Sequence, residues 1–158
     1  MARINPPEVV EVAWVTTMAD YDAPTAAECN AGVDLTGFCR GVPSVPETGN
    51  TADTSDLSSR FNKRQVASYG GDNLTLECYR DDATDTAYTT LVRGTAGFLV
   101  VAWDGLATTG TYATSDAVWV YPSTIISRGM ATPGRDEVEW FTSEQAITDV
   151  PNEAYAIA

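Results

Sequence analysis

Carboxylates are the side chains of this sequence best suited to chemistry, and three of them, Asp81, Asp82 and Asp85, lie close together. A calcium loop needs spaced oxygen ligands, a central glycine and a terminal glutamate, which the run DDATD lacks. Asp82 or Thr84 can instead accept hydrogen bonds from the free amides of a helix start, where Asp85 adds favourable charge. We therefore interpret the cluster as a helix cap. A glycosidase stays an alternative that would need two carboxylates facing each other across a cleft.

Other catalytic and ligand-binding groups are scarce. Histidine is absent, which removes the commonest general base and the commonest nitrogen ligand for metals. Cys29 and Cys39 lack third and fourth partners for a zinc site, and Cys78 stands apart from both. The glycines at Gly94 follow a predicted helix, whereas phosphate loops precede one. We expect no enzyme activity, no bound metal and no cofactor.

The tryptophans offer a second possible cleft, for a carbohydrate. Each lies on a predicted strand beside apolar neighbours, which favours core packing or subunit contact. They are Trp14, Trp103, Trp119 and Trp140.

Length and charge narrow the class of protein. The 158 residues are enough for a single domain, 1–158, with its own core. The formal net charge of −13 with only nine Lys and Arg residues argues against binding a phosphate backbone. No signal-like or membrane-spanning apolar run is visible, so we expect no membrane partner and a reducing cytoplasm as the place of synthesis.

The elements that position these residues centre on the stretch from Gly70 to Gly105. Leu74 to Arg80 alternates as a half-buried strand, and Gly97 to Trp103 runs apolar as a strand covered on both faces. Between them we expect a helix of about three turns, ending at Arg93. Its apolar stripe is Ala87, Tyr88, Leu91 and Val92.

The rest of the chain reads mainly as strands, which predicts a mostly β (α+β) fold with one flanking helix. Pro122 should mark a bend, bulge or edge in its strand, because it cannot donate to a ladder. The predicted strands are Glu8 to Thr17, Ala117 to Gly129, Glu137 to Trp140 and Thr142 to Ile147, with a short helical turn over Ala23 to Gly32.

Three segments look like arms or loops: 1–7 at the N-terminus, 41–59 in the middle and 149–158 at the C-terminus. The middle segment is rich in Pro, Gly, Ser, Thr and Asp, which predicts a long loop that becomes ordered on a neighbouring copy. After it, 60–69 is a predicted strand that should form a hairpin with the Leu74 strand. Its basic residues, Arg60, Lys63 and Arg64, form either a solvated face or an ion-pairing surface for another subunit.

Four motifs resemble the major tail tube proteins of long-tailed (siphovirus-type) phages, in particular the group from phages of actinobacteria. They are PTAAECNAGVDLT from Pro24, LTLECYRDDATDTAYTTL from Leu74, GTAGFLVV from Gly94 and VYPSTI from Val120. Cys29 departs from that group, which often has an aliphatic residue there.

The resemblance implies a β-sandwich or partial barrel whose copies form hexameric rings, stacked into a hollow tube that delivers DNA. It also implies partners: other copies, the tape measure protein, tail terminator and tip proteins, and genomic DNA that passes without specific binding. The protein would then be part of the virion tail, assembled in the host cytoplasm. Closure of strands around a ring would remove exposed sheet edges.

An acidic chain can give a tube whose lumen repels DNA phosphates. From the strand alternation, we expect Glu137 and Glu139 to face the lumen, with Thr75 and Glu77 as further candidates. The alternative from another class is a monomeric β-sandwich, a binding or decoration module of a virion or cell surface.

Overall fold

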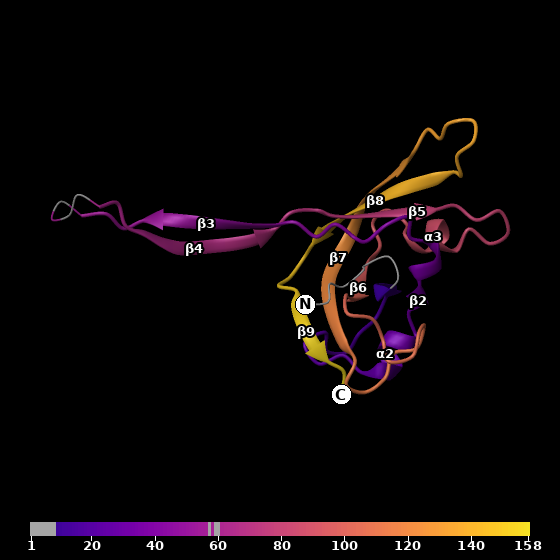
Figure 1. Cartoon of the computed structure of the whole chain (residues 1–158), viewed down its shortest axis with the longest axis horizontal. Coiled ribbons are helices and arrows are strands. Elements are labelled where there is room, and N and C mark those ends of the chain that lie inside the picture. The colour runs from indigo at the N-terminus through magenta and orange to yellow at the C-terminus, as the bar shows by residue number, and fades with distance from the viewer. Residues whose placement is uncertain (1–8, 57, 59–60) are drawn as a thin grey trace, which may run out of the picture.

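One antiparallel seven-stranded sheet organises the chain, and a two-stranded arm extends far from it (Figure 1). The computed structural model describes residues 9–56, 58 and 61–158. The strand order is β2-β1-β6-β7-β8-β5, and β9 pairs with part of β7. The strands are β1 Glu11–Val15, β2 Val33–Asp34, β5 Leu74–Tyr79, β6 Ala96–Ala102, β7 Ala117–Met130, β8 Trp140–Ile147 and β9 Asn152–Ala156.

The sheet follows from residue patterning. In β5, Leu74, Leu76 and Cys78 are fully buried and alternate with more accessible residues, as the period of two predicts. The unbroken apolar run in β6 reflects its place between β1 and β7, with both faces covered. The mostly β prediction is confirmed.

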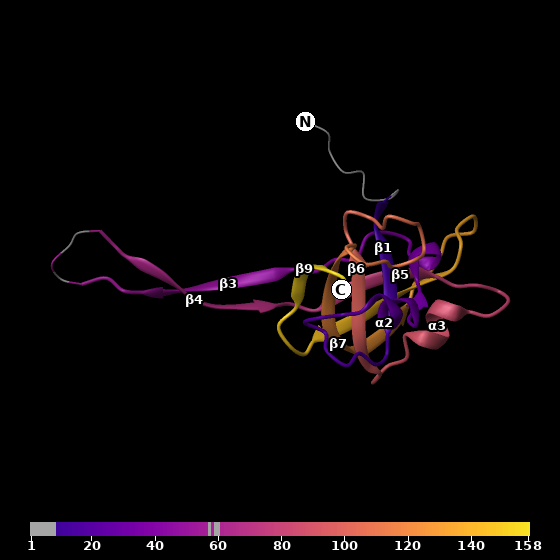
Figure 2. The same cartoon turned by 90° about the horizontal axis from the view of Figure 1, so that it is seen from below.

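Each face of the sheet carries its own hydrophobic cluster, and a different helix packs against each cluster. Figure 2 shows the two helices at separate places on the sheet. On one face, Ala87 and Leu91 of the region of helix α3 (Thr86–Thr90) pack against β5 and β6. On the other, Cys29 of helix α2 (Ala26–Asn30) packs against β1 and β6. A capping box starts α2, where the Glu28 amide donates to the Thr25 hydroxyl and the Thr25 amide donates to the Glu28 carboxylate.

The sheet curls, so that its two ends approach each other around the first cluster. After β2 a 3-10 turn, η1 (Thr36–Phe38), leads the chain to the far edge strand β5. There Cys39 pairs with Cys78, and Ser44 pairs with Thr75. Together these contacts connect the segment after β2 to the β5 edge of the sheet.

The long strand β7 changes partners along one of its edges near Pro122. On one edge β7 pairs with β6 throughout its centre. On the other edge it pairs with β9 up to Val120 and with β8 from Ser123 onward. The Pro122 carbonyl accepts a hydrogen bond from the Thr148 amide, in the connection between β8 and β9. The missing N–H of the proline therefore falls where neither ladder needs it.

The arm is a hairpin of β3 (Glu47–Asp53) and β4 (Arg64–Gly71), and every residue in both strands is exposed. The prediction of a loop over 41–59 was therefore wrong, because β3 occupies its middle. The predicted hairpin between 60–69 and the Leu74 strand was also wrong: β4 pairs with β3, and β5 pairs with β8. A strand with two exposed faces has no hydrophobic alternation to reveal it.

Other predicted boundaries also differ. The helix after β5 is shorter than three turns: Asp85 precedes it in a left-handed conformation, and after Leu91 the chain returns to the sheet, where the Gly94 amide donates to Ile125. Residues 137–139 lie in the connection before β8, so the strand predicted there begins only at Trp140. The C-terminal tail is not free, since β9 pairs with β7 and Ile157 is buried. The predicted arm 1–7 lies outside the described residues.

Candidate functional site

One face of β5 and β8 stays polar and partly accessible, and we call it the open face. Its residues alternate with buried Leu76 and Phe141 on the opposite side of the same strands. Cross-strand pairing places Thr75 opposite Glu144 and Glu77 opposite Thr142. The open face comprises Thr75, Glu77, Tyr79, Trp140, Thr142, Glu144 and Ala146.

Two carboxylates and one guanidinium set the charge of the open face. Arg40 lies over the Trp140 ring, 4.2 Å from its centroid, and its Nη1 is 3.6 Å from a Glu77 oxygen. Glu144 accepts a hydrogen bond of 3.1 Å from the Ser127 hydroxyl. Both interactions leave their groups in contact with solvent, so the ion pair adds little stability. The face therefore presents negative charge and hydroxyl groups.

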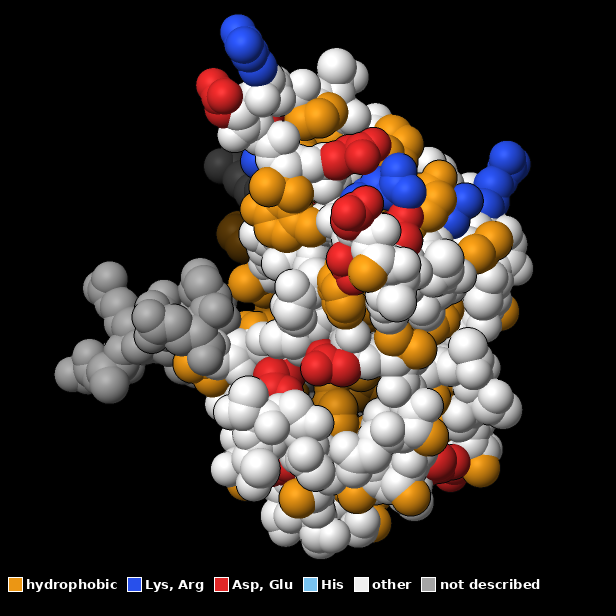
Figure 3. Space-filling view, turned by 90° about the vertical axis from the view of Figure 1, so that its right-hand side faces the viewer, with side chains coloured by type: hydrophobic (Ala, Val, Ile, Leu, Met, Phe, Trp, Pro, Cys, Tyr) orange, Lys and Arg blue, Asp and Glu red, His pale blue; other side chains and the backbone are white. Residues whose placement is uncertain are grey.

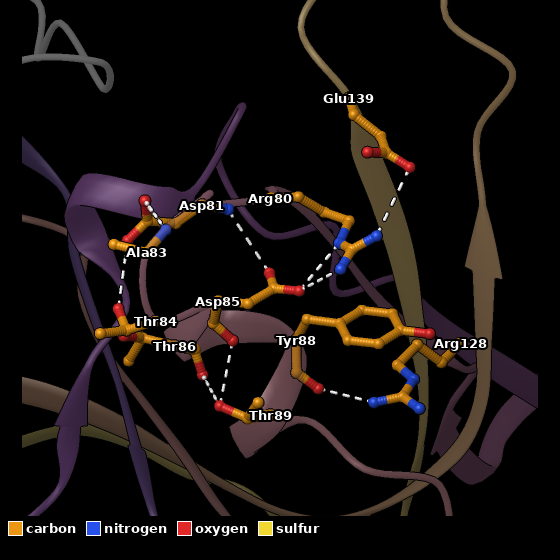
Figure 4. Close-up of polar contacts among 10 residues, drawn as sticks. All are labelled: Arg80, Asp81, Ala83, Thr84, Asp85, Thr86, Tyr88, Thr89, Arg128 and Glu139. Carbon is orange, nitrogen blue, oxygen red and sulfur yellow. Dashed lines mark hydrogen bonds and ion pairs between the residues drawn. The ribbon is translucent and has the colours of Figure 1, made fainter.

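The predicted lumen residues do not lie together. Thr75 and Glu77 share the open face, whereas the Glu139 carboxylate lies 3.5 Å from Arg80 Nη1. The Arg80 guanidinium stacks on Tyr88 of α3, which belongs to the opposite side of the sheet (Figure 4). The Glu137 carboxylate accepts a hydrogen bond from the Gly134 amide within the turn before β8.

The acidic cluster after β5 holds α3 in place (Figure 4). Asp85 forms an ion pair and hydrogen bonds with Arg80, and its hydrogen bond from Arg80 holds the pKa of the Asp85 carboxyl below its ordinary value. Asp81 accepts hydrogen bonds from the Ala83 amide and the Thr84 hydroxyl. The predicted side-chain helix cap was wrong, because no side chain caps α3.

Arg128 completes this contact from β7. Its guanidinium lies 3.7 Å from the centroid of the Tyr88 ring, and Nη1 donates to the Tyr88 carbonyl at 2.6 Å. Tyr88 also meets Phe141 edge to face. The short helix is thereby connected to β5, β7 and β8, and these charged groups have a structural role.

The basic residues of the arm have separate environments. Lys63 Nζ lies 3.1 Å from an Asp56 oxygen near the tip. Arg64 is paired along the ladder with Asp53, on exposed β4. Arg60 lies outside the described residues.

The described residues show no pocket that resembles an active site. They contain no cluster of three or more potential metal ligands. A shallow hollow of about 370 Å³ lies at the base of the arm, between Val45, Tyr69, Tyr121 and Ile147. Trp14 is fully buried, and Trp103 and Trp119 pack against the same cluster, so core packing explains all three.

The end of the molecule opposite the arm has mixed charge (Figure 3). Acidic and basic side chains adjoin one another in its upper part, and the lower part carries few charges. Such a surface has no continuous basic patch for a phosphate backbone. Among the described residues, no helix has the length and apolar character needed to span a membrane.

The sequence reasoning missed the hairpin pairing of the arm and half of the open face. In the arm, the predicted strand over 60–69 overlaps β4, but no strand was predicted at β3. In β8, Trp140, Thr142 and Glu144 alternate with buried Phe141 and Ser143. One unbroken period-two pattern from Trp140 to Ile147, in place of two separate strands, would have identified them.

Comparisons with known proteins agree on the fold. A chain of the anti-feeding prophage baseplate superposes with a TM-score of 0.62 at 13% identity, covering 94% of this chain and 93% of that one. Chains of a native gene transfer agent virion and of the tail of an empty gene transfer agent particle give TM-scores of 0.59 and 0.56, at 11% and 12% identity. In both, 98% of this chain and 100% of the other are covered.

No curated protein matches the sequence. A sequence model described as phage tail tube protein matches residues 2–158, almost the whole chain. Tail tube proteins are structural components of the virion tail, not enzymes. This match shows that the chain belongs to the phage tail tube protein family.

Proposed function

We propose that copies of this chain form hexameric rings that stack into the hollow tail tube, through which the phage genome is delivered. The exposed arm is the observation that carries this proposal. Its two strands bury no residue in the body of the chain. An isolated two-stranded hairpin is only marginally stable in water, so the arm needs a surface on another molecule.

A second copy of the chain is the partner that fits the arm. The arm extends well beyond the body (Figure 1), which gives it reach across a subunit boundary. Its apolar residues Val66 and Tyr69 are exposed and would be covered there. Arg64 is available for a carboxylate of the neighbour, and a chain of net charge −13 offers many. Arg60 and Lys63 are further candidates for this contact.

We assign the open face to the lumen. In a ring whose strands close into a barrel, one face of each sheet must line the channel, and the open face is a polar, partly accessible part of the sheet over β5 and β8. Glu77 and Glu144 would then repel DNA phosphates, while Thr75 and Thr142 offer only weak hydrogen bonds. Glu139 lies on the α3 side, so we propose Glu144 in its place; Glu137 stays a candidate for the rim.

Helical reconstruction of tubes from the purified protein tests the assignment directly. We expect stacked hexamers with Glu77 and Glu144 on the channel wall and the arm against another subunit. Glu77 and Glu144 on the outer surface would refute the lumen assignment. A stable monomer at every concentration, even with the terminator or tip proteins added, would favour the decoration module instead.

A charge reversal tests the role of the lumen. The double variant Glu77→Lys, Glu144→Lys should still form tubes, because both side chains are accessible, but phage carrying it should eject DNA more slowly. The matched control, Asp82→Lys with Asp104→Lys, changes the net charge equally at two exposed positions in connections away from the open face. Equal ejection rates for the two variants would contradict the proposed electrostatic role.

A further inference from the structure

The pair Cys39 and Cys78 is a feature that tube formation does not explain. Cys39 follows η1, and Cys78 lies on β5 with its side chain in the first hydrophobic cluster. The two residues face each other in an isolated antiparallel bridge. Both are free thiols, Cys78 buried and Cys39 half-buried.

The backbone geometry of this bridge suits a covalent bond. The Arg40 amide donates to the Glu77 carbonyl, so the hydrogen bond flanks the cysteine pair. Such a non-hydrogen-bonded pair brings the Cα atoms to about 4.5 Å and the side chains close together. Disulfides span Cα distances of about 4.4 to 6.8 Å, so the bond needs little movement of the backbone.

The two thiols also interact in the reduced protein. A hydrogen bond with Cys39, together with burial, raises the pKa of the Cys78 thiol. Cys78 is therefore a slow nucleophile on its own. Cys39 borders a surface hollow of about 190 Å³ together with Val12 and Arg40, which gives a small oxidant access to its sulfur.

We propose that Cys39 and Cys78 form a disulfide when the protein meets a low-molecular-weight disulfide such as oxidised glutathione. The Cys39 thiolate attacks one sulfur of the oxidant, which forms a mixed disulfide and releases one glutathione thiolate. The Cys78 thiolate then attacks the Cys39 sulfur and releases the second. In sum, two protein thiols lose two protons and two electrons, and one oxidised glutathione becomes two reduced molecules.

The bond would close the base of the arm. The chain between the two cysteines contains all of β3 and β4. Cys39 begins the segment that leads into the arm, and β5 is the strand to which the arm returns. A disulfide here would hold both ends of the arm at a fixed separation and restrict their opening.

The timing of this step rests on the proposed function. A tail protein made in a reducing cytoplasm keeps its thiols, and release into the medium exposes it to oxidants. The bond would thus form after assembly and fix the arms in the finished tail. The chemistry itself belongs to the single chain, so the test below does not depend on tube formation.

The experiment exposes the native full-length protein to oxidised glutathione and counts the remaining thiols after denaturation. Wild type should fall from three thiols to one, with a Cys39–Cys78 peptide pair in a non-reducing digest. Cys29 lies fully buried in the other cluster, so Cys29→Ser should lose both of its thiols. Cys39→Ser is the matched variant that cannot form the bond, and it should keep Cys29 and Cys78 reduced.

A second readout follows the base of the arm. After oxidation, hydrogen exchange of the Arg40 and Ser44 amides, which donate to β5, should slow in wild type and stay unchanged in Cys39→Ser. Persistence of both thiols in wild type, stable glutathione adducts, or bonds between different molecules would overturn the proposal. Tubes that form without the disulfide would not overturn the proposal, because tube formation and thiol oxidation are tested independently.

Discussion

Replacing Gly97 with alanine tests how tightly β6 packs against β1. A Cβ atom at this position would lie 2.7 Å from Trp14 Cζ2 and 2.8 Å from the Val15 carbonyl oxygen. Trp14 is fully buried, and Val15 pairs with Phe98 in the ladder between β1 and β6. Neither atom can retreat without disturbing the core or the ladder. The sheet must therefore absorb the clash.

Two opposing effects set the size of the loss. An alanine in place of glycine stabilises a fold by about 0.4 to 1 kcal/mol when the site accepts it, through the unfolded chain. Overpacking of a filled core costs about 1 to 3 kcal/mol. We expect Gly97→Ala to lower the free energy of unfolding by about 1 to 2 kcal/mol, which corresponds to roughly 2 to 8 °C in Tm.

Urea and thermal unfolding measure the effect, with Trp fluorescence as the signal. Gly129→Ala is the matched control, since a Cβ at this exposed position in β7 meets no atom within 4 Å. It should leave stability unchanged or raise it slightly. Equal midpoints for the two variants would refute the argument that Gly97 is required by close approach.

Three further changes probe other contacts. Leu91→Asp places an unpaired carboxylate at a fully buried site and should prevent folding; soluble protein with native circular dichroism would contradict this. Thr25→Ala removes the capping box with Glu28 and should cost about 0.5 to 2 kcal/mol in urea unfolding, and an unchanged midpoint would count against the cap. The pKa of Asp85 is lowered chiefly by Arg80, so its contribution is fully present above the ordinary pKa and is lost as the pH falls through the folded value. Asp85→Asn should therefore destabilise the protein at neutral pH and make little difference at pH values below the lowered pKa of Asp85, as unfolding across pH would show.

The buried strands could be predicted from sequence because burial leaves a pattern. In β5 the alternation of Leu74, Leu76 and Cys78 fixes both the strand and its inner face. The apolar run of β6 indicates a strand with two covered faces. The family resemblance was confirmed as well, although its actinobacterial subgroup stays a prediction.

Strand β3 and its pairing with β4 could not be predicted, because the arm buries no residue in the body of this chain. Both strands are rich in small and polar residues and are exposed throughout. The composition of β3 is that of a loop, and its ladder with β4 makes it a strand. If residues of the arm are buried, they are buried in a contact with another molecule.

Of the residues predicted to face the lumen, those on β5 could be placed from the sequence, and those before β8 could not. Thr75 and Glu77 follow from the alternation of β5, but the position of Glu139 depends on where β8 begins and on Arg80. Likewise, Asp85 reads as a cap in sequence because its partner Arg80 becomes a neighbour only through the turn after β5. Periodicity shows neither the turn that brings Arg80 to Asp85 nor the distant contact between Arg80 and Glu139.

Pro122 also bears on how β8 and β9 avoid competing for β7. Both strands use the same edge of β7, and in principle either one could extend along it at the expense of the other. A slip of either strand across the junction would place a carbonyl opposite a residue that has no hydrogen to offer. The proline thus divides one long edge into two separate docking stretches, and misaligned forms of the sheet are disfavoured before any side chain is packed.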